Sequence, residues 1–155
     1  MSLKNVIKGL VILVIVPIVA LQFFQIDKRN PPIVQAETLE AAVSVPPDVS
    51  MILGRSCGDC HSNTTIYPWY ANVQPFGWFL KGHIDEGRQK LNFSVFKTYP
   101  ANRQAKKLEN ICSQVENKEM PLPSYLLIHR DAVLKDGDAK VLCDWAKAES
   151  DKIDN

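Results

Sequence analysis

The sequence lacks an excess of charge of either sign. Its 18 basic and 17 acidic side chains give a formal net charge of +1 at pH 7. Lys4 and Lys8 precede every acidic residue, so the chain after residue 26 carries 16 basic and 17 acidic groups. A nucleic-acid-binding domain needs a positively charged patch or stripe. The composition therefore provides no electrostatic footprint for nucleic acid, and we expect no partner of that class.

The sequence also lacks the pattern of a β-sheet protein. No run of residues alternates strictly between apolar and polar side chains, and no internal repeat is present. Apolar residues instead recur at three- and four-residue steps, most clearly at Ala105, Leu108, Ile111, Cys112 and Val115. We therefore predict an all-α fold. Residues that cap or start helices place its helices after Asp48, Pro75, Asn102, Ser124 and Asp136.

Cysteine and histidine are scarce, at four and three residues, but Cys57, Cys60 and His61 lie within five positions. This C-x-x-C-H pattern is typical of the covalent attachment of a c-type haem. Two thiols three positions apart can bond to two vinyl groups on one edge of a porphyrin, and the adjacent histidine then lies beneath the iron as its proximal ligand. The pattern predicts a domain wrapped around one covalent haem.

Two other kinds of site share the C-x-x-C spacing. A redox motif would not need His61 and should lie in a thioredoxin-like βαβ unit. A structural zinc site should bring a second pair of cysteines or histidines at short spacing. The sequence has neither feature, so haem is the preferred hypothesis.

The first 26 residues have the layout of a bacterial export segment. Residues 1–8 form a short basic region with Lys4 and Lys8, and the positions from Gly9 to Phe24 are apolar except for Gln22. A cleavage site after Ala20 would place the bulky Ile18 where a small residue is preferred. We therefore expect an uncleaved, single-pass anchor at 1–26 in the bacterial inner membrane, with the haem domain in the periplasm. Cleavage would instead give an exported, soluble protein.

Composition changes after the anchor. Proline pairs at Pro31-Pro32 and Pro46-Pro47 disfavour helix and strand, so we expect a proline-rich linker at 27–47 that holds the domain a short way off the membrane. The haem domain is then expected at 48–152.

Several short motifs occur in a characteristic order along the chain. They are Asn30-Pro31-Pro32, Cys57-Gly58-Asp59-Cys60-His61-Ser62-Asn63, Tyr67-Pro68-Trp69-Tyr70, His83 with Gly87-Arg88, Leu91-Asn92-Phe93-Ser94, Met120-Pro121-Leu122, and Tyr125 with His129. In this combination the chain resembles the bacterial haem-binding domain family of small, membrane-anchored or periplasmic monohaem proteins. The resemblance implies a c-type haem and electron transfer, with redox proteins of the periplasm or inner membrane as partners.

The sixth ligand of the iron has three candidates. Met120 lies 59 residues after His61 in a proline-stiffened loop, which resembles the way cytochromes c present a distal methionine, and it is preferred. His83 lies on a predicted apolar stripe with Phe76, Phe79, Leu80 and Gly87 and would give a bis-histidine iron. His129 is the third candidate, and it could instead orient the loop of Met120. An open sixth position is the remaining option.

Cys112 and Cys143 are the two cysteines that the C-x-x-C-H pattern does not use, and the expected periplasmic compartment is oxidising. We predict a disulfide between two helices, worth ~3 kcal/mol in the chain-entropy model, and two free buried thiols are the alternative.

Haem propionates need charged or hydrogen-bonding donors, for which Arg55, Arg88 and Trp69 are candidates.

Two classes of function follow. In an electron carrier the iron stays six-coordinate and no small-molecule substrate binds, and this class is preferred. A haem peroxidase or gas sensor would need an open or displaceable sixth position with an acid-base group beside it.

Overall fold

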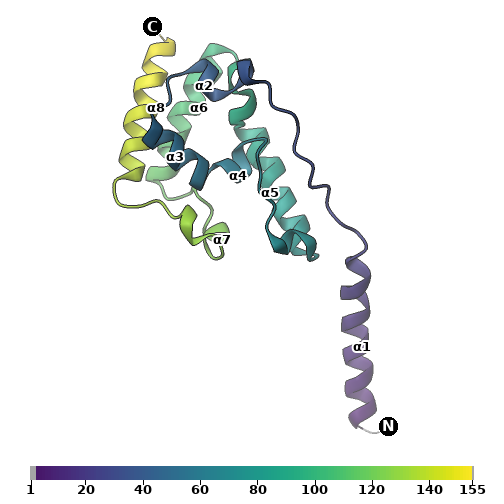
Figure 1. The fold of residues 1–155 in the computed structure, drawn as a ribbon. Coiled ribbons are helices and arrows are strands. Elements are labelled where there is room, and N and C mark those ends of the chain that lie inside the picture. Colours follow the sequence, from purple (N-terminus) through teal and green to yellow (C-terminus); the bar gives the residue numbers. More distant parts are fainter. Residues whose placement is uncertain (1–2, 155) are drawn as a thin grey trace.

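The computed structural model describes residues 3–154 of the chain (Figure 1). Every regular element in that range is helical and none is a strand, which confirms the all-α prediction. The elements are α1 (Leu3–Leu21), η1 (Gln35–Glu37), α2 (Leu39–Ala42), α3 (Pro47–Ser56), α4 (Gly58–His61), η2 (Trp69–Asn72), α5 (Phe76–Lys90), η3 (Phe93–Thr98), α6 (Ala101–Glu116), α7 (Pro123–Leu126), η4 (Arg130–Ala132) and α8 (Asp138–Asp154), where η marks a 3-10 helix.

Helix α1 stands apart from the other helices and buries none of its residues (Figure 1). It is long and apolar enough to cross a membrane. An apolar helix near the N-terminus can also be a signal sequence, so by length and composition α1 fits either a membrane anchor or a signal sequence.

The segment after α1 is attached to the domain along its length. The side chain of Asn30 donates to the Thr65 carbonyl oxygen at 2.9 Å, and that of Asn63 donates to the Pro32 carbonyl oxygen at 3.2 Å. Helices η1 and α2 follow, and Leu39 and Val43 are buried in the main core. The linker predicted at 27–47 is therefore shorter than expected, because the apolar side chains of its second half belong to the domain.

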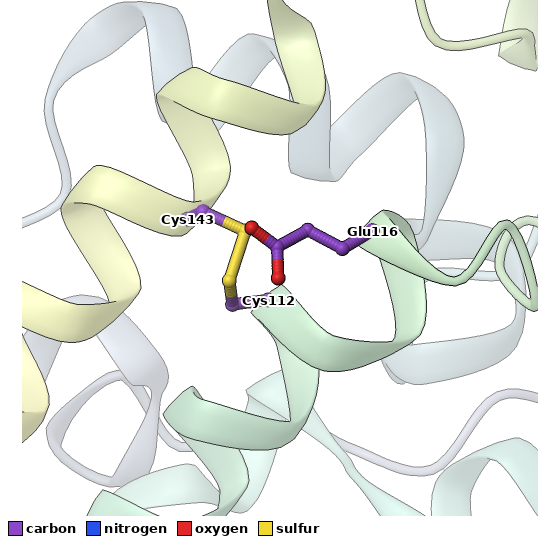
Figure 2. Close-up of side chains that lie close together, drawn as sticks. All are labelled: Cys112, Glu116 and Cys143. Atoms are coloured by element: carbon purple, nitrogen blue, oxygen red, sulfur yellow. A yellow bond between two sulfur atoms is a disulfide. The ribbon is translucent and has the colours of Figure 1, made fainter.

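The main core lies between α6 and α8, with α3 packed against α8. Leu108, Leu142 and Ala146 are fully buried there. The sulfur atoms of Cys112 and Cys143 lie 2.13 Å apart, so the predicted pair is at disulfide distance and joins the two helices. Figure 2 shows the Glu116 carboxylate, one turn along α6, beside this pair. Sulfurs in a disulfide are not thiolates, so the three side chains do not form a metal site in this state.

A smaller core forms on the stripe of α5 that carries Gly77, Leu80, Ile84 and Gly87, where η2 and α4 pack against it. The stripe predicted from the sequence is wrong in part, because Phe76 and Phe79 are 60% and 59% exposed. Periodicity predicts Phe76 and Phe79 on the buried side of α5, whereas η2 packs on the smaller residues beside them. The neighbouring stripe of α5, which includes His83, is not covered by η2 and can contact another part of the molecule.

Candidate haem site

The C-x-x-C-H residues lie on a single turn of helix. Helix α3 ends at Ser56, Cys57 adopts a non-helical conformation, and α4 begins directly at Gly58. The His61 backbone N–H donates to the Cys57 carbonyl oxygen at 2.9 Å, which closes this turn. Both Cys57 and Cys60 are free of disulfide bonds. The turn therefore carries both thiols and the histidine on one short, ordered element.

A cavity of about 560 Å³ lies beside this turn. Its lining includes Cys57, Cys60, His61, His83 and Met120. Helix α5 contributes one wall, and α6 with the loop before α7 contributes another (Figure 1). The structure thus brings together five of the predicted site residues, although 63 positions separate Cys57 from Met120 in the sequence.

His61 is held in the orientation that a metal ligand requires. Its Nδ1 lies 3.1 Å from the Gly87 carbonyl oxygen and 3.0 Å from that of Leu91. Carbonyl oxygens only accept, so Nδ1 carries the proton and Nε2 keeps a free lone pair. Burial lowers the pKa of His61 below its ordinary value. The imidazole is therefore neutral near pH 7, which is the form that binds iron.

His83 has a similar arrangement on α5. Its Nδ1 lies 2.8 Å from the Phe79 carbonyl oxygen, so Nδ1 donates and Nε2 is free. The residue is half-buried and lines the cavity beside Glu86. His83 can therefore offer a nitrogen ligand or an acid-base group to this space.

Met120 enters the cavity from the loop after α6. Its backbone N–H donates to the Gln114 carbonyl oxygen at 3.1 Å. In α7, directly after this loop, the Tyr125 hydroxyl donates to Oδ2 of Asp59 at 2.7 Å and so ties the end of the loop to the C-x-x-C-H turn. Burial and this hydrogen bond raise the pKa of Tyr125 far above its ordinary value, which keeps the hydroxyl protonated.

His129 lies outside the cavity lining and supports Tyr125 instead. The two rings stack with centroids 4.1 Å apart and an interplanar angle of 8°. Nε2 of His129 also lies 2.9 Å from the Tyr70 hydroxyl oxygen. These contacts with Tyr125 and Tyr70 fit the second of its two predicted roles, support for the Met120 loop, better than the role of iron ligand.

The two thiols next to the cavity differ from those of redox C-x-x-C motifs. Burial raises the pKa of Cys57 to about 12 and that of Cys60 to about 11. Redox motifs instead lower the pKa of one cysteine to make a reactive thiolate. The neutral thiols argue against a thioredoxin-like exchange site.

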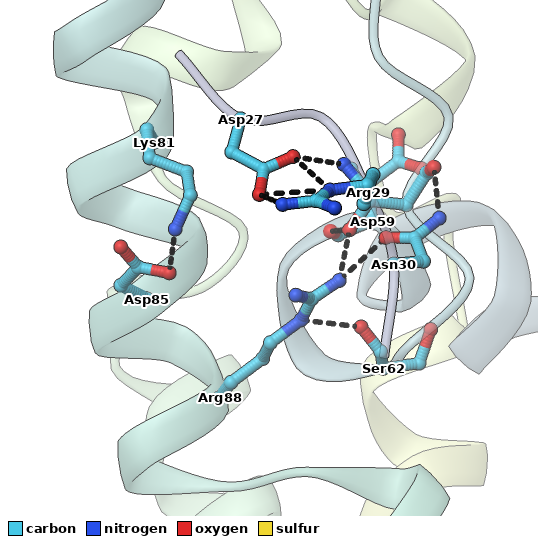
Figure 3. A network of polar contacts seen from close by, with 9 residues as sticks. Asp27, Arg29, Asn30, Asp59, Ser62, Lys81, Asp85 and Arg88 are labelled. Atoms are coloured by element: carbon cyan, nitrogen blue, oxygen red, sulfur yellow. Dashed lines mark hydrogen bonds and ion pairs between the residues drawn. The ribbon is translucent and has the colours of Figure 1, made fainter. Parts of the chain in front are cut away.

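The candidates for propionate contacts do not reach the cavity. Arg55 forms an ion pair with Asp138 at 2.5 Å, and the Trp69 side chain is 73% exposed. Arg88 donates to the Ser62 carbonyl oxygen and to Oδ1 of Asn30, both at 2.8 Å, and Figure 3 shows it between these two segments. Arg88 thus links the chain after α1 to the chain after α4, because its guanidinium donates hydrogen bonds to oxygen atoms of both segments.

Two lysines that the sequence does not predict at the site line the cavity instead. Lys90 and Lys107 face it from α5 and α6, and Lys107 is only 8% exposed. The Lys107 ammonium donates to the Lys90 carbonyl oxygen and lies 4.7 Å from the centre of the Tyr99 ring. A signal was present in the sequence: Lys107, Ile111 and Gln114 form a second helical stripe next to the apolar face, and all of them line the cavity.

The residues present fit a haem. The cavity is within the size range of small-molecule and cofactor sites, and it joins apolar side chains to two free thiols and a correctly oriented histidine. Helix α5 also approaches the C-x-x-C-H turn so closely that a Cβ at Gly87 would lie 2.8 Å from the Cys60 carbonyl oxygen. The close approach of α5 to the turn therefore depends on the absence of a side chain at Gly87.

No curated protein and no solved structure matches the chain. The model of the haem-binding domain family matches residues 16–148, which extend from the last turns of α1 into α8. The match covers most of the chain and includes every residue that lines the cavity. The chain therefore belongs to the haem-binding domain family.

Proposed function

We propose that this protein is a membrane-anchored, monohaem c-type cytochrome that transfers electrons in the bacterial periplasm. One observation carries the proposal: a single cavity is lined by Cys57, Cys60 and His61 and also by Met120. The two thiols would form thioether bonds to haem, and His61 would bind the iron through Nε2. A haem bound in this way supplies a one-electron ferric–ferrous couple.

Met120 is the sixth ligand that the arrangement of the walls supports best. The imidazole of His61 rests against the carbonyl oxygens of Gly87 and Leu91, at the end of α5. His83 lies one turn earlier on the same helix, whereas Met120 comes from the loop after α6. Ligands on opposite faces of a flat cofactor should come from different walls, so Met120 is the better counterpart of His61.

A second candidate function is a haem peroxidase or gas sensor. His83 favours it, because its free Nε2 and the nearby Glu86 could act as an acid-base pair next to an open sixth position. In this case Met120 would be an apolar side chain at the wall of the cavity and would not bind the iron.

The proposed location rests on chemistry and on the N-terminal helix. Attachment of haem c and formation of the Cys112–Cys143 bond are both expected in an oxidising, exported compartment. Lys4 and Lys8 support a cytoplasmic start of α1, because the positive-inside rule favours lysine on that side of the membrane. The haem domain would then lie in the periplasm, attached to the inner membrane by α1.

Spectroscopy of ligand variants tests the proposal. Full-length protein is produced with a haem c maturation system and compared with Met120→Ala, His83→Ala and, as a matched control, Met51→Ala. Met51 is 62% exposed on α3 and is not part of the cavity lining. We expect a covalent haem in all four, a low-spin spectrum indifferent to carbon monoxide in the parent, and loss of the weak methionine-to-iron band only in Met120→Ala.

Other results would overturn parts of the proposal. Absence of a pyridine haemochrome signal would reject covalent haem. Loss of the low-spin spectrum in His83→Ala, with Met120→Ala unchanged, would assign the sixth position to the histidine. Prompt binding of carbon monoxide by the ferrous parent protein would favour the peroxidase or sensor over the carrier.

A further inference from the structure

The large aromatic side chains divide sharply between the core and the surface. The sequence has six phenylalanines and three tryptophans, of which Phe93, Phe96 and Trp145 are buried. The other six are between 40% and 83% exposed and come from only two segments, the residues after α1 and the stretch from η2 into α5. We call these six the aromatic face: Phe23, Phe24, Trp69, Phe76, Trp78 and Phe79.

Hydrogen bonds hold the two segments of the aromatic face together. The Gln22 side chain donates to the Gln74 carbonyl oxygen at 3.0 Å and accepts from the Gln74 backbone N–H at 2.9 Å. Nε1 of Trp78 donates to the Phe24 carbonyl oxygen at 2.9 Å. The face is therefore fixed to the C-terminal end of α1, on the side of the domain from which α1 extends (Figure 1).

The length of α1 gives the depth of the aromatic face in a membrane. Its 19 residues extend over ~28 Å at 1.5 Å per residue, close to a hydrocarbon core of ~30 Å, and the long side chains of Lys4 and Lys8 in its first turns can reach back to the cytoplasmic headgroups. If α1 spans the bilayer, as the proposed function requires, Leu21 lies at the boundary between hydrocarbon and headgroups. The residues bonded to positions 22–25 then lie at the level of the headgroups.

The chemistry of the aromatic face suits that level. No charged residue occurs between His61 and Lys81, the stretch that supplies Trp69, Phe76, Trp78 and Phe79. Tryptophan and tyrosine gather at membrane–water interfaces because their rings are apolar while their N–H and O–H groups stay hydrated. Six exposed aromatic side chains on two adjoining segments are otherwise unusual for a surface in contact with water.

We propose that the aromatic face is inserted into the lipid headgroup interface of the bilayer that α1 crosses. The domain then lies on the membrane in a fixed orientation and does not hang from a flexible linker. This inference rests on the membrane anchor of the proposed function and adds a second, interfacial contact to it.

Fluorine NMR on the full-length protein in lipid nanodiscs tests this directly. Labelling with 5-fluorotryptophan gives resonances for Trp69, Trp78 and Trp145, which Trp69→Phe and Trp78→Phe assign. A nitroxide-bearing lipid, labelled near the headgroup, is then compared with the unlabelled lipid. We expect the Trp69 and Trp78 resonances to lose most of their intensity and the buried Trp145 resonance to keep it.

A pair of variants separates insertion from mere proximity. Phe76→Ser with Phe79→Ser removes apolar area from the face, and we expect it to reduce the intensity loss at Trp69. Met51→Ser, which removes an exposed apolar side chain of α3, should leave that loss unchanged.

Each failure has a distinct meaning. Protein that floats with vesicles but shows the same intensity for all three tryptophans would overturn the docking while leaving the anchor intact. Two chains per disc without lipid contact at Trp69 would assign the face to a second copy and also overturn the proposal. Protein that does not float would reject both the anchor and the docking, whereas its haem spectrum would still test the electron carrier.

Discussion

Two glycines on the same helix provide a matched pair for testing how α5 supports the haem turn. A Cβ at Gly87 would lie 2.8 Å from the carbonyl oxygen of Cys60 and 3.2 Å from its carbonyl carbon and its Cβ. Real Cβ atoms do not approach a backbone oxygen so closely, so α5 and α4 must move apart in Gly87→Ala. At Gly82, also within α5, a Cβ would meet nothing within 4 Å.

The expected magnitudes follow from two opposing effects. Alanine is more favourable than glycine inside a helix by ~1 kcal/mol, and this gain applies in the middle of α5 at Gly82 and more weakly near its end at Gly87. Overpacking a well-packed site costs ~1–3 kcal/mol, and this cost applies only at Gly87. Gly82→Ala should therefore stabilise the fold by ~1 kcal/mol, and Gly87→Ala should be less stable than Gly82→Ala by at least the overpacking cost.

Guanidinium unfolding of the two full-length variants, followed by circular dichroism, measures this difference. The absorbance of the haem provides a second readout, because the Gly87 carbonyl oxygen accepts from Nδ1 of His61 and a displaced α5 alters that bond. Gly82→Ala should keep the spectrum of the parent. If Gly87→Ala were as stable as Gly82→Ala and kept the same spectrum, the close approach of α5 to the haem turn would be refuted.

Three further predictions concern the loop of Met120 and the disulfide. Tyr125→Phe removes the hydroxyl that donates to Asp59 and should cost ~1–2 kcal/mol; it should also weaken the methionine-to-iron band, and an unchanged spectrum would contradict a role in positioning Met120. Alkylation without reductant, followed by mass measurement, should label neither Cys112 nor Cys143, whereas label on both would contradict the disulfide. Cys112→Ser with Cys143→Ser should lower the free energy of unfolding by ~3 kcal/mol.

The parts of the structure that could be predicted from the sequence are those encoded by local patterns. Helical periodicity and the proline at position 75 predicted the helices now seen as α5 and α6, because both signals act within a few residues. The spacing of Cys57, Cys60 and His61 identified the turn beside the cavity for the same reason. The Cys112–Cys143 pair was predicted by counting the cysteines that remained.

The parts that could not be predicted depend on long-range packing. Which stripe of α5 is buried depends on η2, and periodicity alone does not show where a neighbouring element lies. Arg88 was selected as a haem contact for its charge, but carbonyl and amide oxygens from two distant segments bind it first. Lys107 was overlooked because a lysine is normally exposed, whereas this one is buried between α6 and the aromatic ring of Tyr99.

Helix α5 connects the two proposed sites. Its first turn carries Phe76, Trp78 and Phe79 of the aromatic face, and its last turn supplies the Gly87 carbonyl oxygen that orients His61. Phe76 and Gly87 are separated by a rise of ~17 Å along the helix axis at 1.5 Å per residue. Because a helix of this length is rigid, docking of the aromatic face would hold the haem site at no more than about that height above the lipid interface. If both proposals hold, a redox partner would have to present its own cofactor close to the membrane surface, and a partner anchored in the same bilayer would meet this requirement better than a freely diffusing carrier.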